Sequence, residues 1–215
     1  MTWWFYDFSK FVLWLFFRAG FGLEVVGREH VPRSGAFLVA SNHVSYLDPP
    51  LVGAACPRRL RFMAQADLFR HPLLGAFLRG VHAISLKREA GDLAALRAAL
   101  ASLRGGAGVA IFPEGGRQLS GTLGAPKRGV GLLADAAKVP VIPALVQGTF
   151  QALPPGAARL HRAKIRVAFG EPIAYTETPV PGRHEQVAEA VAQAWRRLAQ
   201  RTHDPRSVAE RKDPS

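Results

Sequence analysis

Apolar residues along the chain fall into short runs that alternate with segments of helical periodicity. Leucines recur at helical spacing from Asp92 to Arg104, with Asp92 placed to cap the helix, and a second amphipathic helix is predicted from Gly182 to Arg201. Runs of β-branched and apolar residues predict strands at 23–27, 36–41, 60–65, 82–87, 109–113, 141–147 and 164–169. This alternation predicts an α/β fold: a single domain with a mostly parallel central sheet flanked by helices.

The start of the chain has a different pattern. Ten of the 20 aromatic residues lie within the first 23 positions. The longest uninterrupted apolar run there, Phe11 to Phe17, is far shorter than the ~20 residues that span a bilayer. On a helix, Asp7, Lys10 and Arg18 fall along one stripe, and nearly every other residue is apolar. This pattern is typical of a helix that lies in the membrane interface. The alternative is a helix packed on the protein's own core.

The domain organisation follows from these patterns. No internal repeat and no shift in composition marks a second domain, and the last residues are polar without an apolar period. We therefore expect an aromatic membrane-associating segment at 1–21, one α/β domain at 22–201 and a disordered tail at 202–215.

Composition and charge narrow the class of partner. Hydrophobic residues make up 48% and charged residues 20%, which is ordinary for a globular protein. The 28 basic and 16 acidic residues give a net charge of +12, which suits an anionic bilayer, a phosphorylated substrate or a nucleic acid, although a general bias toward Arg is the alternative. The aromatic residues are not interleaved with basic ones and no nucleic-acid motif is present, so we expect no nucleic-acid partner. A single cysteine, Cys56, excludes an internal disulfide, and the His residues lack metal-ligand clustering, so we expect no metal site.

The first chemical motif is SNHVSYLDPP, residues 41–50, directly after a predicted strand. In an open α/β sheet, ligand sites collect at the carboxyl ends of the strands. Pro49 disfavours helical geometry at Asp48, so the peptide from His43 to Asp48 is expected to turn and bring the carboxylate back to the imidazole. A His held in this way is a general base for acyl transfer. The alternative is that Asp48 and Pro49 simply begin a helix.

The second motif is FPEGGR, residues 112–117, after another predicted strand. Pro and two Gly predict a tight turn whose backbone N–H groups form an anion cradle. Arg117 adds a charged fork, and Glu114 could contact a glycerol hydroxyl or orient Arg117. By itself, such a turn is also compatible with an ordinary loop.

With both motifs in place, the sequence resembles the glycerolipid acyltransferases, the family that includes bacterial 1-acylglycerol-3-phosphate acyltransferase. Asn42-His43-x-x-x-x-Asp48-Pro49 matches the catalytic block, and Phe112 to Arg117 matches the block associated with the phosphate-bearing acceptor. The likeness runs from about residue 20 to 175. It also covers a second block at 64–88, a basic-Gly segment at 127–129 and a fourth block at 139–143.

The resemblance implies direct acyl transfer from acyl-CoA or acyl carrier protein to a lysophospholipid, most simply 1-acylglycerol-3-phosphate, which would give phosphatidic acid. His43 would be the base and Asp48 its support. The acceptor would be bound by Glu114, Gly115, Gly116, Arg117, Arg88 and Lys127, with no metal or other cofactor. Ser45 or Cys56 could in principle be acylated, but neither has a base beside it. The resemblance places the enzyme on the cytoplasmic face of the cell membrane, as a peripheral or monotopic protein.

The sequence departs from the family pattern near the acceptor. Gly116 stands where Thr is usual, Gln65 and Asp67 stand where Lys and Glu are common, His82 replaces a frequent Gly, and Lys87 occupies an often acidic place. Two alternatives therefore stay open: an acyltransferase for another lyso-lipid, such as a lyso-ornithine lipid, and a non-catalytic basic membrane-binding protein with a degenerate acyltransferase fold.

Overall fold

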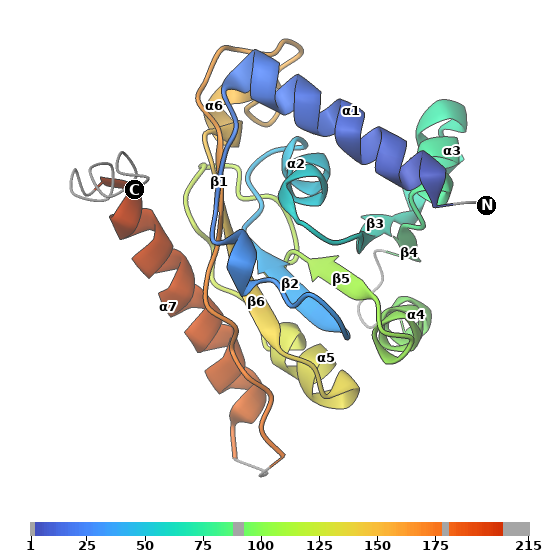
Figure 1. The fold of residues 1–215 in the computed structure, drawn as a ribbon, viewed down its shortest axis with the longest axis vertical. Coiled ribbons are helices and arrows are strands. Elements are labelled where there is room, and N and C mark those ends of the chain that lie inside the picture. Colours follow the sequence, from blue (N-terminus) through green and yellow to red (C-terminus); the bar gives the residue numbers. More distant parts are fainter. Residues whose placement is uncertain (1–2, 88–92, 178–180, 204–215) are drawn as a thin grey trace, which may run out of the picture.

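A seven-stranded sheet forms the centre of the protein (Figure 1). The computed structural model describes residues 3–87, 93–177 and 181–203. The strands are β1 (Glu24–Val26), β2 (Phe37–Ser41), β3 (Leu60–Gln65), β4 (Ile84–Leu86), β5 (Gly108–Ile111), β6 (Val141–Gln147) and β7 (Arg166–Phe169). They lie in the order β1-β7-β6-β2-β5-β3-β4. Only the β6–β7 pair is antiparallel among these neighbours, so the prediction of a mostly parallel sheet is confirmed.

Helices cover both faces of the sheet. They are α1 (Trp4–Phe21), α2 (Asp48–Ala55), α3 (Pro72–Gly80), α4 (Leu93–Arg104), α5 (Gly129–Ala137), α6 (Thr149–Ala152) and α7 (Arg183–His203), with short 3₁₀ helices η1 (Arg28–His30) and η2 (Ala66–Arg70). Helix α2 packs on one face and α1 lies over it, whereas α4, α5 and α7 cover the other face (Figure 1).

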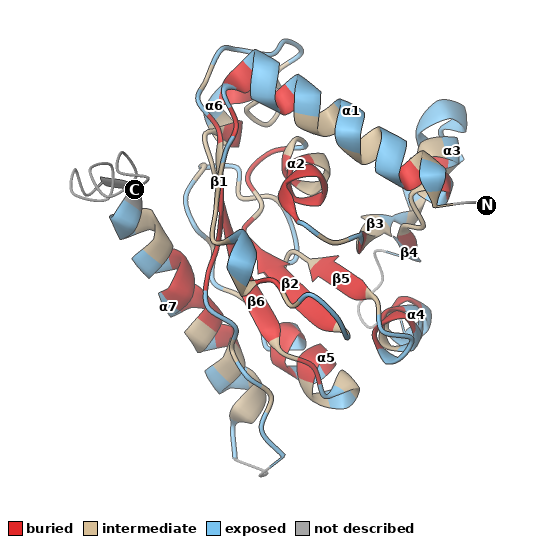
Figure 2. Ribbon diagram, viewed as in Figure 1, coloured by how far each residue is buried: buried red, intermediate tan, exposed pale blue. Residues whose placement is uncertain are grey.

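Strand β2 shows how one apolar run serves both layers. Phe37 and Val39 belong to the core cluster under α1 and α2, whereas Leu38 and Ala40 belong to the cluster under α4, α5 and α7. Successive side chains of a strand point to opposite faces, so a strand buried on both faces must be apolar throughout. Figure 2 accordingly shows β2, β5 and β6 as buried.

The predicted elements match the structure closely where the apolar run was clear. The strands predicted at 60–65 and 141–147 have the observed bounds of β3 and β6. Helix α4 begins at Leu93, so the capping role predicted for Asp92 falls outside the described residues. Helix α7 continues to His203, two residues beyond the predicted domain end, and the rest of the predicted tail is likewise outside the described residues.

Helix α1 has two apolar faces. Its inner face buries Tyr6, Phe17 and Phe21, and the Leu60 N–H donates a hydrogen bond to the Tyr6 hydroxyl at 2.8 Å. Its outer face is largely exposed (Figure 2), and the exposed fractions of Trp4 and Phe8 are 65% and 58%. Each interpretation of the aromatic segment therefore applies to one face of α1. The inner face is part of the core, and the outer face is an uncovered apolar surface. None of the described helices has the length and apolarity needed to cross a bilayer.

The close packing of α5 on α7 generates a stability prediction. A Cβ at Gly131 would lie 2.5 Å from the backbone of His184, whereas a Cβ at Gly129, in the same helix, would meet nothing within 4 Å. Gly131→Ala should destabilise the fold by about 1–3 kcal/mol through overpacking, and Gly129→Ala should stabilise it by up to about 1 kcal/mol. Urea unfolding of the two variants beside the wild type measures both effects, and equal midpoints would contradict the described helix contact.

Candidate active site

The two sequence motifs meet at the carboxyl ends of two adjacent parallel strands. His43 follows β2, and the segment from Phe112 to Arg117 follows β5. After β2 the chain passes to α2 on one face of the sheet, and after β5 it passes to α5 on the other face. Such a divergence of neighbouring connections opens a crevice at the strand ends, which is where α/β sheets bind their ligands.

The centre of the site is the pair predicted from the sequence. His43 Nδ1 lies 2.9 Å from Asp48 Oδ2, and the Asp48 side chain is completely buried. The same oxygen accepts the backbone N–H groups of Val44 and Ser45, both at 2.7 Å. Asp48 is also the first residue of α2, so the pairing and the helix start, which the sequence left as alternatives, occur together. Because a carboxylate accepts, Nδ1 carries the proton and Nε2 is left to act as base.

The imidazole of His43 is held from a second side by the other motif. Its ring stacks on Phe112, with the centroids 4.3 Å apart and the planes at 29°. The Gln118 N–H donates to the His43 carbonyl at 2.8 Å. The His43 side chain keeps 16% exposure. The imidazole is therefore fixed in orientation and still partly exposed.

Asn42 anchors the catalytic turn to the sheet. Its side-chain amide donates to the Val146 carbonyl at 3.0 Å and its amide oxygen accepts the Val146 N–H at 2.7 Å. These bonds extend the pairing of β2 with β6 one residue beyond the end of β2. The sequence analysis placed Asn42 only within a motif or turn. A polar amide directly after a buried strand was the available signal.

Glu114 joins the two motif loops. Its carboxylate accepts the His43 N–H on one oxygen and the Gly124 N–H on the other, both at 3.2 Å. Burial raises the pKa of Glu114 to about 7, although these hydrogen bonds oppose the shift. Both oxygens thus have backbone partners, and the predicted contact of Glu114 with the substrate stays a prediction.

Arg117 has no ion-pair partner among the described residues. Its guanidinium carbon lies 3.5 Å from the ring centroid of Tyr46, a residue of the His43–Asp48 turn. Its Nη1 is buried and has no hydrogen-bond partner within the described parts of the chain. A buried guanidinium N–H left unpaired is costly, so the group is suited to an incoming anion. The sequence analysis did not identify Tyr46, because a stacking partner leaves no local pattern.

The glycine turn brings Lys127 to the same place. Gly115 has φ +79°, and a Cβ on it would lie 2.6 Å from Lys127 Nζ. The Lys127 N–H donates to the Pro113 carbonyl at 2.9 Å. Gly116 has open space at its Cβ position, so no packing reason requires glycine where the family usually has Thr. The predicted Arg88 lies outside the described residues.

The two possible nucleophiles, Ser45 and Cys56, are buried. Ser45 is fully buried and its hydroxyl donates to the Leu153 carbonyl at 2.8 Å. Cys56 is fully buried, and burial raises the pKa of its thiol to about 11. Neither group is available as a nucleophile near neutral pH. Within the described ranges, no three His, Cys, Asp or Glu side chains gather as a metal site would require.

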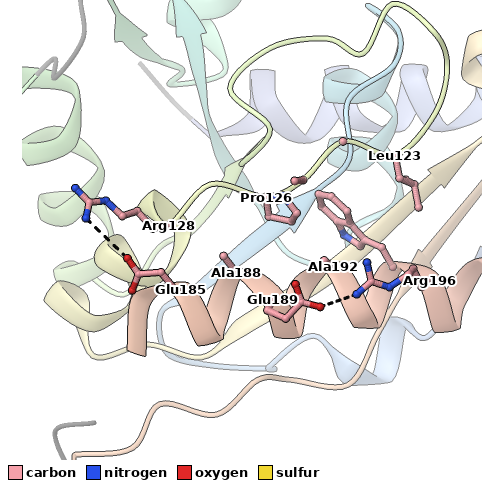
Figure 3. A pocket seen from close by; sticks show the side chains of 11 residues that line it. Leu123, Pro126, Arg128, Glu185, Ala188, Glu189, Ala192 and Arg196 are labelled. Atoms are coloured by element: carbon pink, nitrogen blue, oxygen red, sulfur yellow. Dashed lines mark hydrogen bonds and ion pairs between the residues drawn. The ribbon is translucent and has the colours of Figure 1, made fainter. Parts of the chain in front are cut away.

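A hollow of about 390 Å³ lies beside the glycine turn, between residues 123–126 and α7 (Figure 3). Its two arginines are both ion-paired: Arg128 with Glu185 at 3.8 Å, and Arg196 with Glu189 at 2.6 Å. The indole N–H of Trp195, which also lines it, donates to the Ala40 carbonyl of β2 at 3.2 Å. This hollow contains none of the catalytic residues and offers no unpaired arginine.

The chain is similar to known acyltransferases over most of its length. The family model described as Acyltransferase matches residues 22–147, more than half of the chain. The 1-acyl-sn-glycerol-3-phosphate acyltransferase of Bacillus subtilis is 28% identical over 181 residues, which cover 82% of this chain and 88% of that protein. The alpha form of the enzyme with that name from Homo sapiens is 35% identical over 136 residues, covering 61% of this chain and 47% of the human protein.

A solved structure has the same fold. The crystal structure of the 1-acyl-sn-glycerophosphate acyltransferase from Thermotoga maritima superposes with a TM-score of 0.77 at 24% sequence identity. The match covers 93% of this chain and 79% of that one. The α/β architecture predicted from the sequence is therefore that of a solved acyltransferase.

Proposed function

The chain belongs to the Acyltransferase family, and from this premise we propose that it transfers a fatty acyl group from a thioester to the free hydroxyl of 1-acylglycerol-3-phosphate, giving phosphatidic acid. The observation that carries the proposal is the 2.9 Å contact between His43 and the buried Asp48, beside Arg117, which has no counterion in the part of the chain that the structure describes.

In the proposed reaction, His43 Nε2 takes the proton of the acceptor hydroxyl as its oxygen attacks the thioester carbonyl carbon. The tetrahedral intermediate then collapses, the carbon–sulfur bond breaks, and the imidazolium returns the proton to the leaving thiolate. Asp48 keeps the imidazole in the tautomer that this requires and stabilises the imidazolium. The burial of Ser45 and Cys56 supports direct transfer without an acyl-enzyme.

The acceptor phosphate would be bound by Arg117 and Lys127. The unpaired Nη1 of Arg117 and the position of the Lys127 ammonium at the Gly115 turn support this assignment. The names of the relatives, all 1-acyl-sn-glycerol-3-phosphate acyltransferases, point to the same acceptor. An acceptor without a phosphate, such as a lyso-ornithine lipid, would provide no phosphate for these two cations to bind.

The donor in this proposal is acyl-CoA or acyl carrier protein, which present the same thioester. A thioester is already activated by its thiolate leaving group, so the proposed chemistry requires a base and an oriented acceptor but no metal or prosthetic group.

We propose further that the outer face of α1 lies on the membrane surface. It exposes large apolar side chains at helical spacing: Trp4, Phe8, Phe11, Val12, Leu15 and Phe16. Helix α3 extends this surface, because the rings of Phe5 and Phe77 join the two helices at 6.2 Å and Leu73 is 79% exposed. The net charge of +12 favours the cytoplasmic leaflet, whose surface is anionic.

The catalytic pair is tested by acyl transfer from a palmitoyl thioester to lysophosphatidic acid in detergent. His43→Ala and Asp48→Asn should each lower kcat by about 10²–10⁴-fold, since one removes the base and the other its orienting carboxylate. Circular dichroism should show both variants folded. Turnover by His43→Ala at the wild-type rate would contradict the assignment of the base, and no turnover by the wild type would favour another acceptor or a non-catalytic role.

The phosphate assignment is tested by comparing acceptors. Arg117→Gln should raise KM for lysophosphatidic acid by about 10–100-fold, the value of a charge-assisted hydrogen bond, and leave KM for monoacylglycerol unchanged. Arg128→Gln removes the same charge from a side chain paired with Glu185 and serves as the matched control. Equal damage to both acceptors in Arg117→Gln would show that Arg117 does not recognise the phosphate.

The membrane assignment is tested by vesicle sedimentation. The double variant Phe8→Ser, Phe11→Ser should bind vesicles about tenfold or more weakly, because it removes two aromatic side chains from the apolar face. Leu132→Ser, which changes an exposed apolar residue of α5, should bind like the wild type. If the double variant sediments as fully as the wild type, the anchor lies elsewhere.

A further inference from the structure

A second hollow, of about 570 Å³, lies at the opposite end of the sheet from the catalytic pair. It is lined by Trp3, Asp7 and Lys10 beside residues 57–61 and 105–108. These segments lead into the amino ends of β3 and β5, whereas the catalytic residues follow the carboxyl ends of β2 and β5. Nothing in the proposed acyl transfer uses this hollow.

The charged side chains of the hollow are mostly cationic. Lys10, Arg58, Arg59 and Arg61 line it, and Asp7 is the one carboxylate among the lining residues. Asp7 is engaged by Arg59 in a two-bond ion pair, at 2.9 and 2.5 Å. The other three cations therefore have no carboxylate among the residues that line the hollow.

The contacts of the two remaining arginines orient them without neutralising them. Arg58 donates to the carbonyl oxygens of Pro32 and Gly35, at 3.1 and 2.6 Å. Arg61 donates to the Ser102 hydroxyl at 3.0 Å. These acceptors carry no formal charge, so both guanidinium charges stay uncompensated. The hollow in Figure 3 differs in this respect, because both of its arginines form ion pairs with glutamates.

Lys10 lies on the side of α1 that faces the hollow. It is partly buried on the flank of α1, and in the described parts of the chain its ammonium has neither a hydrogen bond nor an ion pair. Burial lowers the pKa of Lys10 and the nearby Arg28 adds to the shift, although Cys56 and Asp7 oppose it. A bound anion would offset both effects.

The position of the hollow indicates the source of the anion. Asp7 and Lys10 are neighbours in α1 of Phe8 and Phe11, which project from its outer apolar face. A lipid with its acyl chains along that face would have its headgroup phosphate at the level of the hollow. Trp3, whose ring lies 5.0 Å from the Arg59 guanidinium carbon, provides the amphipathic ring typical of this level.

We propose that this hollow binds the headgroup phosphate of an anionic phospholipid, at a site separate from the acceptor site. The inference rests on the membrane-surface placement of α1 proposed above and on none of the catalytic residues. With such a site, the affinity of the enzyme for a bilayer rises with the content of anionic lipid by more than the net charge alone predicts.

The test compares the wild type with Lys10→Gln on vesicles of phosphatidylcholine, with and without phosphatidylglycerol. Loss of one basic contact near an anionic surface is expected to weaken binding to the anionic vesicles by about 5–10-fold. Binding to pure phosphatidylcholine and acyl transfer in detergent should not change. Arg197→Gln, which removes the same charge from the exposed side of α7, should weaken anionic binding by less than about twofold.

A folding defect is separated by thermal unfolding. Lys10→Gln removes a partly buried, unpaired charge, so its Tm should equal or exceed that of the wild type. If Lys10→Gln and Arg197→Gln weaken binding to anionic vesicles equally, the effect is one of net charge, and the proposed site is wrong.

Two further arms separate the source of the phosphate from the membrane placement. If inorganic phosphate at constant ionic strength abolishes the wild-type preference for anionic vesicles, the site holds free phosphate and the lipid assignment is wrong. If the wild type binds no vesicles, the membrane placement fails. Calorimetry then measures the binding of water-soluble glycerophosphoglycerol, which tests the headgroup site without a membrane. The Arg117→Gln variant is used so that the acceptor site does not contribute. Binding that Lys10→Gln abolishes would retain the hollow as a headgroup site, and no binding would overturn it.

Discussion

The buried carboxylate of Asp48 is the group on which the active site depends. One of its oxygens receives three hydrogen bonds, from the His43 imidazole and from the backbone of Val44 and Ser45. A fully buried charge requires such partners, so this oxygen dictates the shape of the turn that precedes it, while the other oxygen is buried without a hydrogen bond in the described parts of the chain. The same residue begins α2, which packs between the sheet and α1. The geometry of the base is thereby coupled to the packing of the domain.

The second motif depends on the first through a few side-chain contacts with the backbone. Glu114 receives the His43 N–H, and Phe112 lies against the imidazole, so the acceptor loop and the catalytic turn are held as one unit. Tyr46 places an aromatic face of the turn against Arg117. A change in the acceptor loop would therefore displace His43, because Glu114 and Phe112 contact it directly. This coupling suits a reaction in which the bound hydroxyl must meet Nε2 in one orientation.

The sequence predicted the elements whose patterns are local. Strands β3 and β6 were found at their true bounds because each is a continuous apolar run between turn signals, and the pairing of His43 with Asp48 followed from five residues. Of helix α2 only the start, at Asp48 and Pro49, was offered as an alternative, since the helix is buried on nearly all sides and has no amphipathic period. The bonds of Asn42 to Val146 and of Glu114 to His43 span 104 and 71 residues, and such contacts leave no spacing to detect.

Helix α1 connects the chemistry to the proposed membrane surface. Its inner face packs on α2, whose first residue is Asp48, so one layer of helix separates the catalytic turn from the apolar outer face. A lyso-lipid whose chain stays in the bilayer needs to lift only its headgroup and hydroxyl past this layer to reach His43. In the proposed reaction the acceptor phosphate would meet Arg117 at the carboxyl ends of the strands, while the cations around Lys10 lie at the amino ends. Two phosphate contacts at opposite ends of one sheet would fix the orientation of the domain on the bilayer, which a single contact leaves free to rotate.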